Sequence, residues 1–452
     1  MKRLFVLSLL LLGPMVHTGA REVCFSGTAP IDDREYEVSV NGRSIPVYPA
    51  HSQYNGGVYY YAQFDIDGKS DIRIKTAGSF EKLEVLPRNS GIRLRHNGPQ
   101  EIAFRASRPF KLVFERDGRL YPLLLFADRP SERPAAAENV TILGPGIHEG
   151  VYRLSSGESL YLEEGAVLHG AIEAEGDNIT VSGRGIVTGE RYRKYKGPSS
   201  FAFNARNCRN LKVEGLTFTS AWNWNFVLRS CENVEVEGVK IVCSNIINDD
   251  AFDICDSRNV LVHNCFARTQ DDVFAIKGYA GKYTCENIRM EDCLVWTDRA
   301  NIWRIGFECT CAGDVMRNIT AKNIDVLHYS ENERPIDHFW AKAIFWIQPS
   351  NGITIEDCLF EDIRIHASYN DTILLEAVPS LTSGPIPGKG RVKYTGTGSA
   401  RNITIRNVSV TGDSSVFTGP VRIVPSKGGH TVENIRLKGI RYFGKRQKFP
   451  TQ

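Results

Sequence analysis

The sequence lacks the features that would place it in several common classes of protein. Beyond residue 20, the 452-residue chain has no apolar run approaching the length of a membrane span. It contains no CxxC with a matching Cys or His pair and no HExxH, so the usual zinc patterns are excluded. Its 55 Lys and Arg nearly balance its 52 Asp and Glu, which favours neither nucleic acid nor an acidic membrane surface as a partner.

Residues 1–20 have the pattern of a secretory signal peptide. Lys2 and Arg3 precede a short apolar run, and small residues follow as far as Ala20. The run is too short for a membrane span, and a segment of this kind is cleaved on export. We therefore predict a secreted or periplasmic protein with no membrane insertion after cleavage. An uncleaved anchor is the alternative.

A short phrase recurs from residue 139 onward, made of a short alternating strand, a small or polar corner and a second short strand. It reads "NLKVEGLTF" at 210, "NVEVEGVKI" at 233, "NVLVHNCFA" at 259, "NIRMEDCLV" at 287 and "NITAKNIDV" at 318. The spacings of 23, 26, 28 and 31 residues are typical of a solenoid. Short strands rich in Val and Ile, without helical periodicity, predict a right-handed parallel β-helix. A β-propeller would need repeats of about 40 residues.

The chain divides where this phrase begins. Residues 21–130 lack it and show alternating strands joined by Gly, Pro and Asp turns, which is typical of an antiparallel β-sandwich. The Pro- and Ala-rich residues 127–138 are the expected linker. We therefore predict an all-β protein, with a signal peptide at 1–20, a β-sandwich domain at 21–130 and a β-helix catalytic domain at 131–452.

Eleven cysteines in an exported protein would ordinarily suggest disulfides. Several of them instead keep a fixed distance from the Asn of the repeat, as Cys208, Cys231, Cys265, Cys285 and Cys293 do. Residues at one phase of a stacked repeat lie above one another in the core, where free Cys packs as a small hydrophobe. We predict that most of these cysteines are buried thiols.

Two acidic pairs occupy one phase of the repeat. "NDDAFDI" at 248–254 and "QDDVFAIK" at 270–277 are offset by 22 residues, which superposes Asp249 on Asp271 and Asp250 on Asp272. Equivalent residues of stacked coils lie about 4.8 Å apart. Like charges at that distance destabilise one another and raise at least one pKa. Acidic residues at a solvated turn would explain one such pair, but two in register indicate a function.

A pair of carboxyl groups suits glycoside hydrolysis. That reaction needs a protonated carboxyl for the leaving oxygen and an ionised carboxylate for the other face of the sugar. Asp250 and Asp272 could hold a water between them, and Asp271 could act as the acid. A separation of about 6.5–9.5 Å between acid and base would give inversion.

These motifs resemble those of the polygalacturonases, glycoside hydrolase family 28. The resembling stretch is "SAWNWNFVLRSCENVEVEGVKI" followed by the two Asp motifs. The resemblance implies that Trp224 flanks the site, that Asp271 is the general acid, and that Asp250 and Asp272 activate water. The Gly-His-Gly and Arg-Ile-Lys motifs of that family are missing.

A second resemblance covers nearly the whole mature chain. Residues 301–330, "NIWRIGFECTCAGDVMRNITAKNIDVLHYS", are similar to the coil that follows the Asp pair in the dextranase and isopullulanase family, glycoside hydrolase family 49. That family also has a β-sandwich before its β-helix. Its Gln-x-Gly-Trp is replaced here by "RIGF", with Arg304 and Phe307.

Further residues are expected to contact the substrate. Both families keep a Lys at the position of Lys277, which could bind a hydroxyl or a carboxylate, although a surface Lys is the alternative. Trp224 could stack on a sugar or fill the core. Arg299 and Arg304 could bind an anionic sugar, or form surface ion pairs. We also place Asp249 among the substrate-binding residues.

We therefore predict an inverting glycoside hydrolase that cleaves a polysaccharide or oligosaccharide and resembles either a dextranase or a polygalacturonase. We expect no cofactor, no metal and a monomeric state. A polysaccharide lyase on the same fold is one alternative, and its Ca²⁺ would need several converging carboxylates. A non-catalytic glycan-binding β-helix is the other.

Overall fold

The protein is described by a computed structural model. It covers residues 20–22, 35–53, 57–330, 341–366, 372–378, 383–386, 390–393, 398–412, 417–423 and 432–449. The predicted signal peptide lies outside these residues except for Ala20, where β1 begins. Regular structure in the described part of the chain consists of strands, so this part has no helix that could cross a membrane.

Two sheets come first in the chain. The first contains β1 (Ala20–Glu22), β4 (Tyr48–His51), β5 (Val58–Ile66), β7 (Leu83–Leu86), β10 (Phe110–Arg116) and β11 (Leu123–Asp128). The second contains β2 (Tyr36–Val40), β3 (Arg43–Ile45), β6 (Ser70–Thr76), β8 (Arg95–His96) and β9 (Glu101–Ala106). The alternation of apolar and charged residues along β6 determines which face of the strand packs in the core. Ile72 and Ile74 are buried, while Arg73 and Lys75 are exposed. The predicted β-sandwich is present.

One strand pair departs from the antiparallel pattern. β11 runs parallel to β5, although it forms an antiparallel pair with β10. The strand reads LLLFAD and is buried along its whole length. One of its faces meets the sandwich core, and Phe126 on the other meets Phe266 of the later repeat, with ring centroids 4.9 Å apart. A strand covered on both faces needs apolar residues at every position, so alternation is lost.

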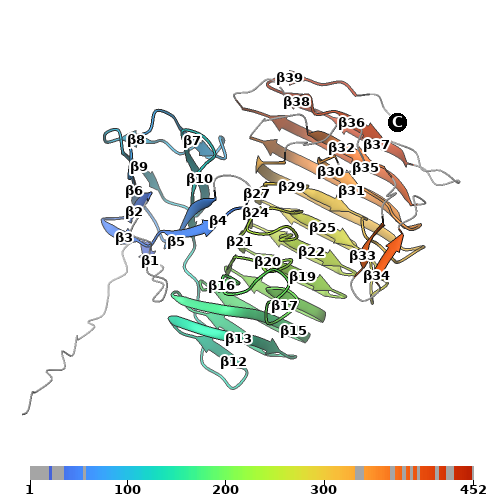
Figure 1. The fold of residues 1–452 in the computed structure, drawn as a ribbon, viewed down its shortest axis with the longest axis horizontal. Coiled ribbons are helices and arrows are strands. Elements are labelled where there is room, and N and C mark those ends of the chain that lie inside the picture. Colours follow the sequence, from blue (N-terminus) through green and yellow to red (C-terminus); the bar gives the residue numbers. More distant parts are fainter. Residues whose placement is uncertain are drawn as a thin grey trace, which may run out of the picture.

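The rest of the chain forms a parallel β-helix, in which each complete coil contributes one strand to each of three stacks (Figure 1). The ladder stack contains β12 (Val140–Leu143), β14 (Ser159–Leu162), β20 (Glu232–Glu237), β23 (Arg258–His263), β26 (Glu286–Glu291) and β37 (Val432–Lys438). The sandwich-side stack contains β16 (Ile186–Thr188), β18 (Thr217–Thr219), β21 (Lys240–Val242), β24 (Phe266–Thr269), β27 (Leu294–Thr297) and β38 (Arg441–Tyr442). The aspartate stack contains β19 (Phe226–Arg229), β22 (Phe252–Cys255), β25 (Phe274–Lys277), β28 (Trp303–Ile305), β30 (Ala343–Ile347), β32 (Ile373–Ala377) and β36 (Val421–Ile423).

Longer strands pass from one stack to the next. They are β13 (Gly146–Leu154), β15 (Ala166–Gly183), β17 (Phe203–Glu214), β29 (Val315–His328), β31 (Thr354–Ile365) and β35 (Ser399–Val410). The sheet ends at β39 (Lys445–Arg446), and β33 (Ser383–Ile386) and β34 (Gly390–Lys393) form a separate hairpin. These elements confirm the solenoid predicted from the repeat.

The interior of the β-helix is a set of columns with one residue from each coil. In the aspartate stack, Phe252 lies on Phe274 and Phe274 on Trp303, with ring centroids 5.6 Å and 6.1 Å apart. The ten cysteines from Cys208 to Cys358 are all buried and unpaired, which confirms the prediction of stacked thiols. Stacked rings and thiols keep the interior close-packed from one coil to the next.

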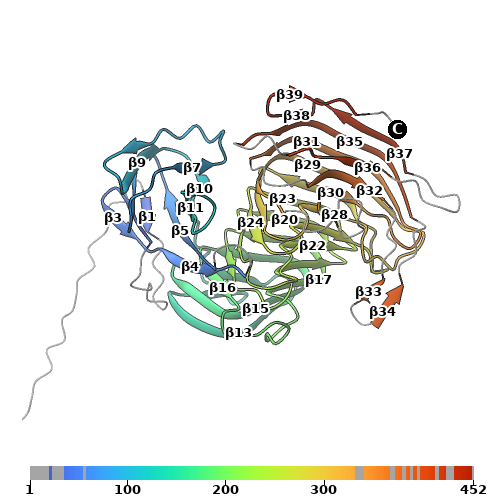
Figure 2. The ribbon, with the colours of Figure 1, turned by 45° about the horizontal axis from the view of Figure 1, so that its top comes forward.

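The sandwich packs against the sandwich-side stack of the β-helix (Figure 2). The contact is both apolar and charged. Phe126 lies on Phe266, and Asp65 accepts a hydrogen bond of 2.9 Å from Arg184 Nε. Thr217 Oγ1 donates to Gln63 Oε1 at 2.7 Å. Buried charges are stable in a protein when they are paired in this way. The apolar and polar contacts together form a continuous interface between the sandwich and the β-helix.

Candidate active site

The two acidic motifs stack as their spacing predicts. β22 and β25 pair in parallel, with Phe252 opposite Phe274 and Ile254 opposite Ile276. The turn before each strand carries one acidic pair. One carboxylate oxygen from each of Asp250, Asp271 and Asp272 lies within 4.8 Å of the other two. The structure therefore brings together the three residues that were predicted to be catalytic.

Asp272 is held on one side by Asn301. Its Oδ1 accepts hydrogen bonds from Asn301 N at 3.0 Å and from Asn301 Nδ2 at 2.7 Å. Arg304 Nη1 lies 3.8 Å from the other oxygen. Burial raises the pKa of Asp272, the Arg304 charge opposes the rise, and the neighbouring Asp271 adds to it.

Asp250 faces a buried ammonium group. Lys277 Nζ lies 3.3 Å from Asp250 Oδ2 and 2.8 Å from Asp253 Oδ1. Burial raises the pKa of Asp250 well above its usual range, the charge of Asp253 adds to this, and Lys277 opposes it. Burial alone would lower the pKa of Lys277, but Asp253 and Asp250 outweigh it and raise that pKa, so Lys277 stays charged. Lys277 is only 2% exposed, so the surface alternative is wrong.

Asp271 is the most accessible carboxylate of the three, with 15% of its side chain exposed. Its Oδ2 accepts a hydrogen bond from Asn248 N at 3.1 Å, and its Oδ1 accepts one from Asp272 N at 3.0 Å. Arg299 Nη1 lies 3.7 Å from Oδ2. A carboxyl held by backbone donors and open to solvent is placed to meet a substrate oxygen.

Asp249 has a different environment from the one predicted. It is fully buried, and both of its oxygens accept backbone hydrogen bonds, from Ser244 at 2.8 Å, Gln270 at 2.7 Å and Asp271 at 2.9 Å. Burial raises its pKa to about 7, and the backbone donors oppose the rise. A carboxylate with no exposed surface does not contact a sugar, so its predicted substrate-binding role is corrected to one of holding backbone.

Aromatic rings and cations pack against one another beside the carboxylates. Trp224 stacks on Phe201 at a centroid distance of 5.3 Å, and Lys277 Nζ lies 3.7 Å from the centre of the Trp224 ring. The Arg304 guanidinium lies 3.7 Å from the ring centre of Phe307 and 4.1 Å from that of Trp346. Such cation–π contacts fix the orientation of both cations.

Unsatisfied buried polar atoms follow the same face of the aspartate stack. Asp253, Ala275, Arg304, Trp346 and Glu376 form one column through successive strand pairs. Within the described residues, the buried polar atoms of this column without a hydrogen-bond partner include Arg304 Nε, Trp346 Nε1 and both carboxylate oxygens of Glu376. Buried polar groups are nearly always paired in proteins. In this column, Glu376 Oε1 still lies 3.8 Å from Arg422 Nη2, so a charge partner stands near one of these atoms.

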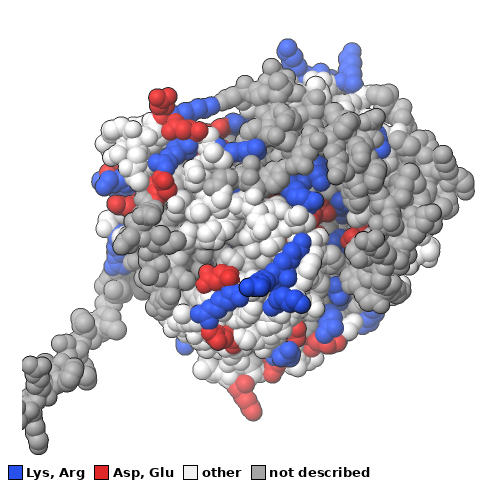
Figure 3. All heavy atoms as spheres, in the orientation of Figure 1, with Lys and Arg blue, Asp and Glu red and all other residues white. Residues whose placement is uncertain are grey.

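Sequence reasoning missed several residues of this site. Asp253 was present in the "NDDAFDI" motif but was not assigned a role, and burial raises its pKa to about 6 against the effect of Lys277. Lys194 Nζ and Tyr195 OH both donate to Asn248 Oδ1, at 3.1 Å and 2.7 Å. The dense basic and aromatic run "RYRKYK" was the available signal for these two. On the face seen in Figure 3, Lys and Arg side chains gather in a band across its lower half.

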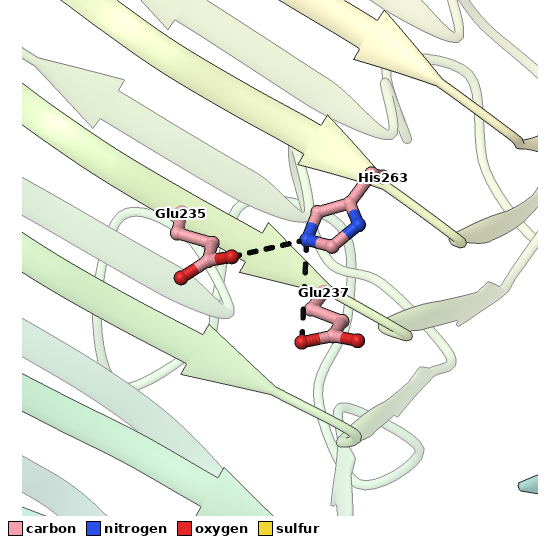
Figure 4. Close-up of side chains that lie close together, drawn as sticks. All are labelled: Glu235, Glu237 and His263. Atoms are coloured by element: carbon pink, nitrogen blue, oxygen red, sulfur yellow. Dashed lines mark hydrogen bonds and ion pairs between the residues drawn. The ribbon is translucent and has the colours of Figure 1, made fainter.

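Two other features lie away from this site. Glu235 and Glu237 of β20 lie beside His263 of β23 (Figure 4), and His263 Nε2 is 3.2 Å from Glu235 Oε1 and 4.0 Å from Glu237 Oε2. These side chains are partly exposed, and the hydrogen bond between His263 and Glu235 joins the two strands. A cavity of about 420 Å³ opens on the N-terminal sandwich, lined by residues that include Tyr36, Arg73 and Glu101, and contains none of the clustered aspartates.

The segment that carries these carboxylates is similar to a known family. Residues 164–293, which contain both acidic motifs, match glycosyl hydrolases family 28. The predicted resemblance to this family is therefore confirmed for that segment. No curated protein matches the chain significantly.

The fold is shared with a solved structure. Dex49A from Penicillium minioluteum is 14% identical, and the match covers 95% of this chain and 94% of that one with a TM-score of 0.68. The family 28 exopolygalacturonase of Yersinia enterocolitica is 11% identical, with coverage of 89% and 97% and a TM-score of 0.45. The polygalacturonase from Erwinia carotovora ssp. carotovora is 15% identical, with coverage of 70% and 86% and a TM-score of 0.43. The likeness to Dex49A extends over the sandwich and the β-helix together and supports the predicted architecture.

Proposed function

We propose that this protein is a glycoside hydrolase whose reaction takes place at Asp250, Asp271 and Asp272. The observation that carries the proposal is the convergence of these three carboxylates within 4.8 Å, inside the segment that matches glycosyl hydrolases family 28.

Each carboxylate has a role in the proposed reaction. The carboxyl of Asp271 gives its proton to the glycosidic oxygen as the bond from that oxygen to the anomeric carbon breaks. A water held by Asp250 and Asp272 attacks the anomeric carbon and passes a proton to one of them. Burial and the neighbouring negative charges raise the pKa values of Asp250 and Asp272, which favours retention of a proton by this pair. The position of Asp271, the most accessible of the three, supports its assignment as the acid.

The stereochemical outcome that we propose is inversion. The nearest carboxylate oxygens are closer than the roughly 6.5–9.5 Å that is usual between acid and base in inverting enzymes. Two oxygens less than 4.8 Å apart can, however, both accept hydrogen bonds of about 2.7–2.8 Å from one water. The water therefore fits between Asp250 and Asp272 while Asp271 faces the substrate. Proton NMR of the first product, recorded before mutarotation, tests this, since a retained anomer would exclude the water-mediated route.

The proposed substrate is a polysaccharide or oligosaccharide of the dextranase or polygalacturonase type. Lys277, Arg299 and Arg304 each lie within 4.0 Å of an aspartate, so much of their charge is compensated inside the site. A panel of neutral, uronic and sulfated glycans, followed by release of reducing ends, identifies the class. If Arg304 binds an acidic sugar, Arg304→Ala should raise KM for acidic glycans alone. Equal loss on neutral and acidic glycans would favour a dextranase-like site.

The same carboxylates also allow a second candidate, a polysaccharide lyase. Their three oxygens could contribute to a Ca²⁺ site, although Ca²⁺ takes six to eight oxygen ligands. The buried ammonium of Lys277, 3.3 Å from Asp250, disfavours a cation there because like charges repel. Activity that survives EDTA and yields no unsaturated sugar would support the hydrolase. Loss of activity in EDTA together with an ultraviolet-absorbing product would support the lyase.

We also propose that the protein acts outside the cytoplasm, after removal of residues 1–20, and that it acts as a monomer. The support is the charged and apolar pattern at the start of the sequence. Mass spectrometry of the protein recovered from the periplasm or the medium tests the cleavage, and a retained amino terminus would contradict it. Size-exclusion chromatography with light scattering tests the monomeric state.

A further inference from the structure

Ser244 occupies an unusual position between the sandwich and the aspartates. It follows β21, is fully buried, and has a φ of 94°. Residues other than glycine rarely adopt such a backbone, which costs of order 1–3 kcal/mol and persists only where the surroundings hold it. The contacts that hold Ser244 therefore maintain this unfavourable backbone conformation.

Those contacts come from the N-terminal sandwich. Gln53 N donates to Ser244 O at 2.9 Å, and the Ser52 and Ser244 hydroxyls are 3.2 Å apart. Tyr59 OH donates to the carbonyl of Cys243. Burial raises the pKa of Tyr59 well above its usual value, so its hydroxyl remains a donor at neutral pH. Residues of the β4–β5 region therefore form hydrogen bonds to Cys243 and Ser244, two consecutive residues of the β-helix.

Ser244 in turn holds the catalytic turn. Its backbone N donates to Asp249 Oδ2, and the other oxygen of Asp249 accepts from the backbone of Gln270 and Asp271. Ser244 Oγ also donates to Asp298 Oδ2 at 2.6 Å, two coils further along the β-helix. One continuous chain of hydrogen bonds therefore leads from the sandwich, through Ser244 and Asp249, to the backbone of Asp271.

We propose that the N-terminal sandwich is a positioning element of the active site, which acts on Asp271 through Ser244 and Asp249. This rests on the proposed function for the role of Asp271. A displacement of a catalytic group by about 1 Å can cost a hundredfold in rate. Among the described residues, the carboxyl of Asp271 accepts hydrogen bonds from the backbone of Asn248 and Asp272, and Arg299 Nη1 lies 3.7 Å from it.

The sandwich could instead be a simple docking partner. It makes comparable buried contacts elsewhere, such as Thr217 Oγ1 to Gln63 Oε1 at 2.7 Å. Among the described residues, that contact has no hydrogen-bonded route to Asp250, Asp271 or Asp272, so it supplies a matched control. A docking role predicts that the loss of either contact has the same effect. A positioning role predicts that only the contact at Ser244 affects the chemistry.

The test compares full-length variants that lose only hydroxyl groups. The double variant Ser52→Ala/Tyr59→Phe removes the two side-chain contacts of the sandwich to residues 243 and 244. The control, Thr217→Val, removes one hydroxyl at the same interface. We expect kcat of the double variant to fall about tenfold or more, with KM changed less than about twofold. Thr217→Val should keep the kcat of the wild type, and Ser52→Thr should restore most of the loss due to Ser52→Ala.

A second measurement does not depend on activity. The backbone N–H groups of Gln270 and Asp271 are donors to Asp249, so their hydrogen exchange reports its position. Exchange in the peptide that contains them should be faster in the double variant and unchanged in Thr217→Val. Wild-type exchange and kcat in the double variant would overturn the inference. Exchange could be faster in the double variant while the wild type hydrolyses no glycan. That outcome would reject the proposed function but retain the structural link from the sandwich to Asp271.

Discussion

The ladder stack and the aspartate stack both carry polar residues that recur once in each coil. In the ladder stack, Asn259 Nδ2 donates to Asn233 Oδ1 at 3.0 Å, and Asn287 Nδ2 donates to Asn259 Oδ1 at 2.8 Å. In the aspartate stack, Asp250 and Asp272 are buried, and burial raises both pKa values. The two columns share a period and differ in their chemistry.

The difference follows from donors and acceptors. A side-chain amide has both, so an asparagine can bond the residue above and the residue below without limit. The ladder asparagines also have positive φ, 53° at Asn259, which Asn tolerates at a corner. Ionised carboxylates have acceptors alone, so stacking them requires outside donors, counter-ions or a retained proton. In the aspartate stack, Lys277 supplies a counter-ion and Asn301 supplies an outside donor. Stacked carboxylates that need such support indicate selection for chemistry over stability.

Removal of the acid should give the largest effect. Asp271→Asn keeps the shape of the side chain and removes the transferable proton, so kcat should fall about 10²–10⁴-fold. Folding should persist because repulsion is relieved. An activated aryl glycoside should restore part of the rate, since a good leaving group needs no acid, whereas Asp250→Asn and Asp272→Asn should show no such rescue.

The control for that experiment lies in the other column. Asn259→Asp places a carboxylate in the exposed ladder, where no catalytic group is nearby. Steady-state kinetics should show an unchanged kcat. Full activity in Asp271→Asn would remove the acid assignment.

The pH dependence of stability should separate the two columns further. Burial raises the pKa of Asp253 from 3.8 to about 6, so the folded protein holds this proton more tightly than the unfolded chain. Its contribution to the free energy of unfolding is therefore greatest below about pH 4 and falls as the pH rises to about 6. Urea titrations across that interval should show a flatter profile for Asp253→Asn than for the wild type. Parallel profiles would contradict the raised pKa.

A ladder substitution should cost a smaller and pH-independent amount. Asn259→Ala loses two side-chain hydrogen bonds and places Ala at positive φ. The free energy of unfolding should decrease by about 1–2 kcal/mol, with kcat unchanged. Chemical denaturation measures the first quantity and a reducing-sugar assay the second. A loss of activity that exceeds the loss of stability would mean that the ladder is coupled to the site.

The interior thiols should give the smallest effect. The ten cysteines from Cys208 to Cys358 are buried and form no disulfide, so a reducing agent should leave the melting temperature unchanged. Thiol titration without reductant should find these ten after denaturation and few of them in the native protein. Mass mapping of four or five disulfides would contradict the stacked-thiol arrangement.

Much of the site could be predicted because the repeat determines which residues of successive coils are neighbours. The 22-residue offset placed Phe252 on Phe274, and the register of β22 and β25 agrees. The same offset brought together the carboxylates of Asp250, Asp271 and Asp272. Hydrogen bonds between parallel strands carry such a register from one coil to the next. The parallel β5–β11 pair was not predicted, because strand order in the sandwich depends on contacts distant in the sequence.

The sequence by itself determined the period, the fold of both regions, the column of thiols and the meeting of the three carboxylates. Only the tertiary structure decided which polar groups are satisfied and by what. Asp249 holds backbone instead of sugar, and Lys277 is buried among the carboxylates of Asp250, Asp253 and Glu308. Ser244 is held by Ser52, which lies 192 residues earlier in the chain. Periodicity fixes neighbours within the repeat, whereas the burial and pairing of a charge depend on every segment packed around it.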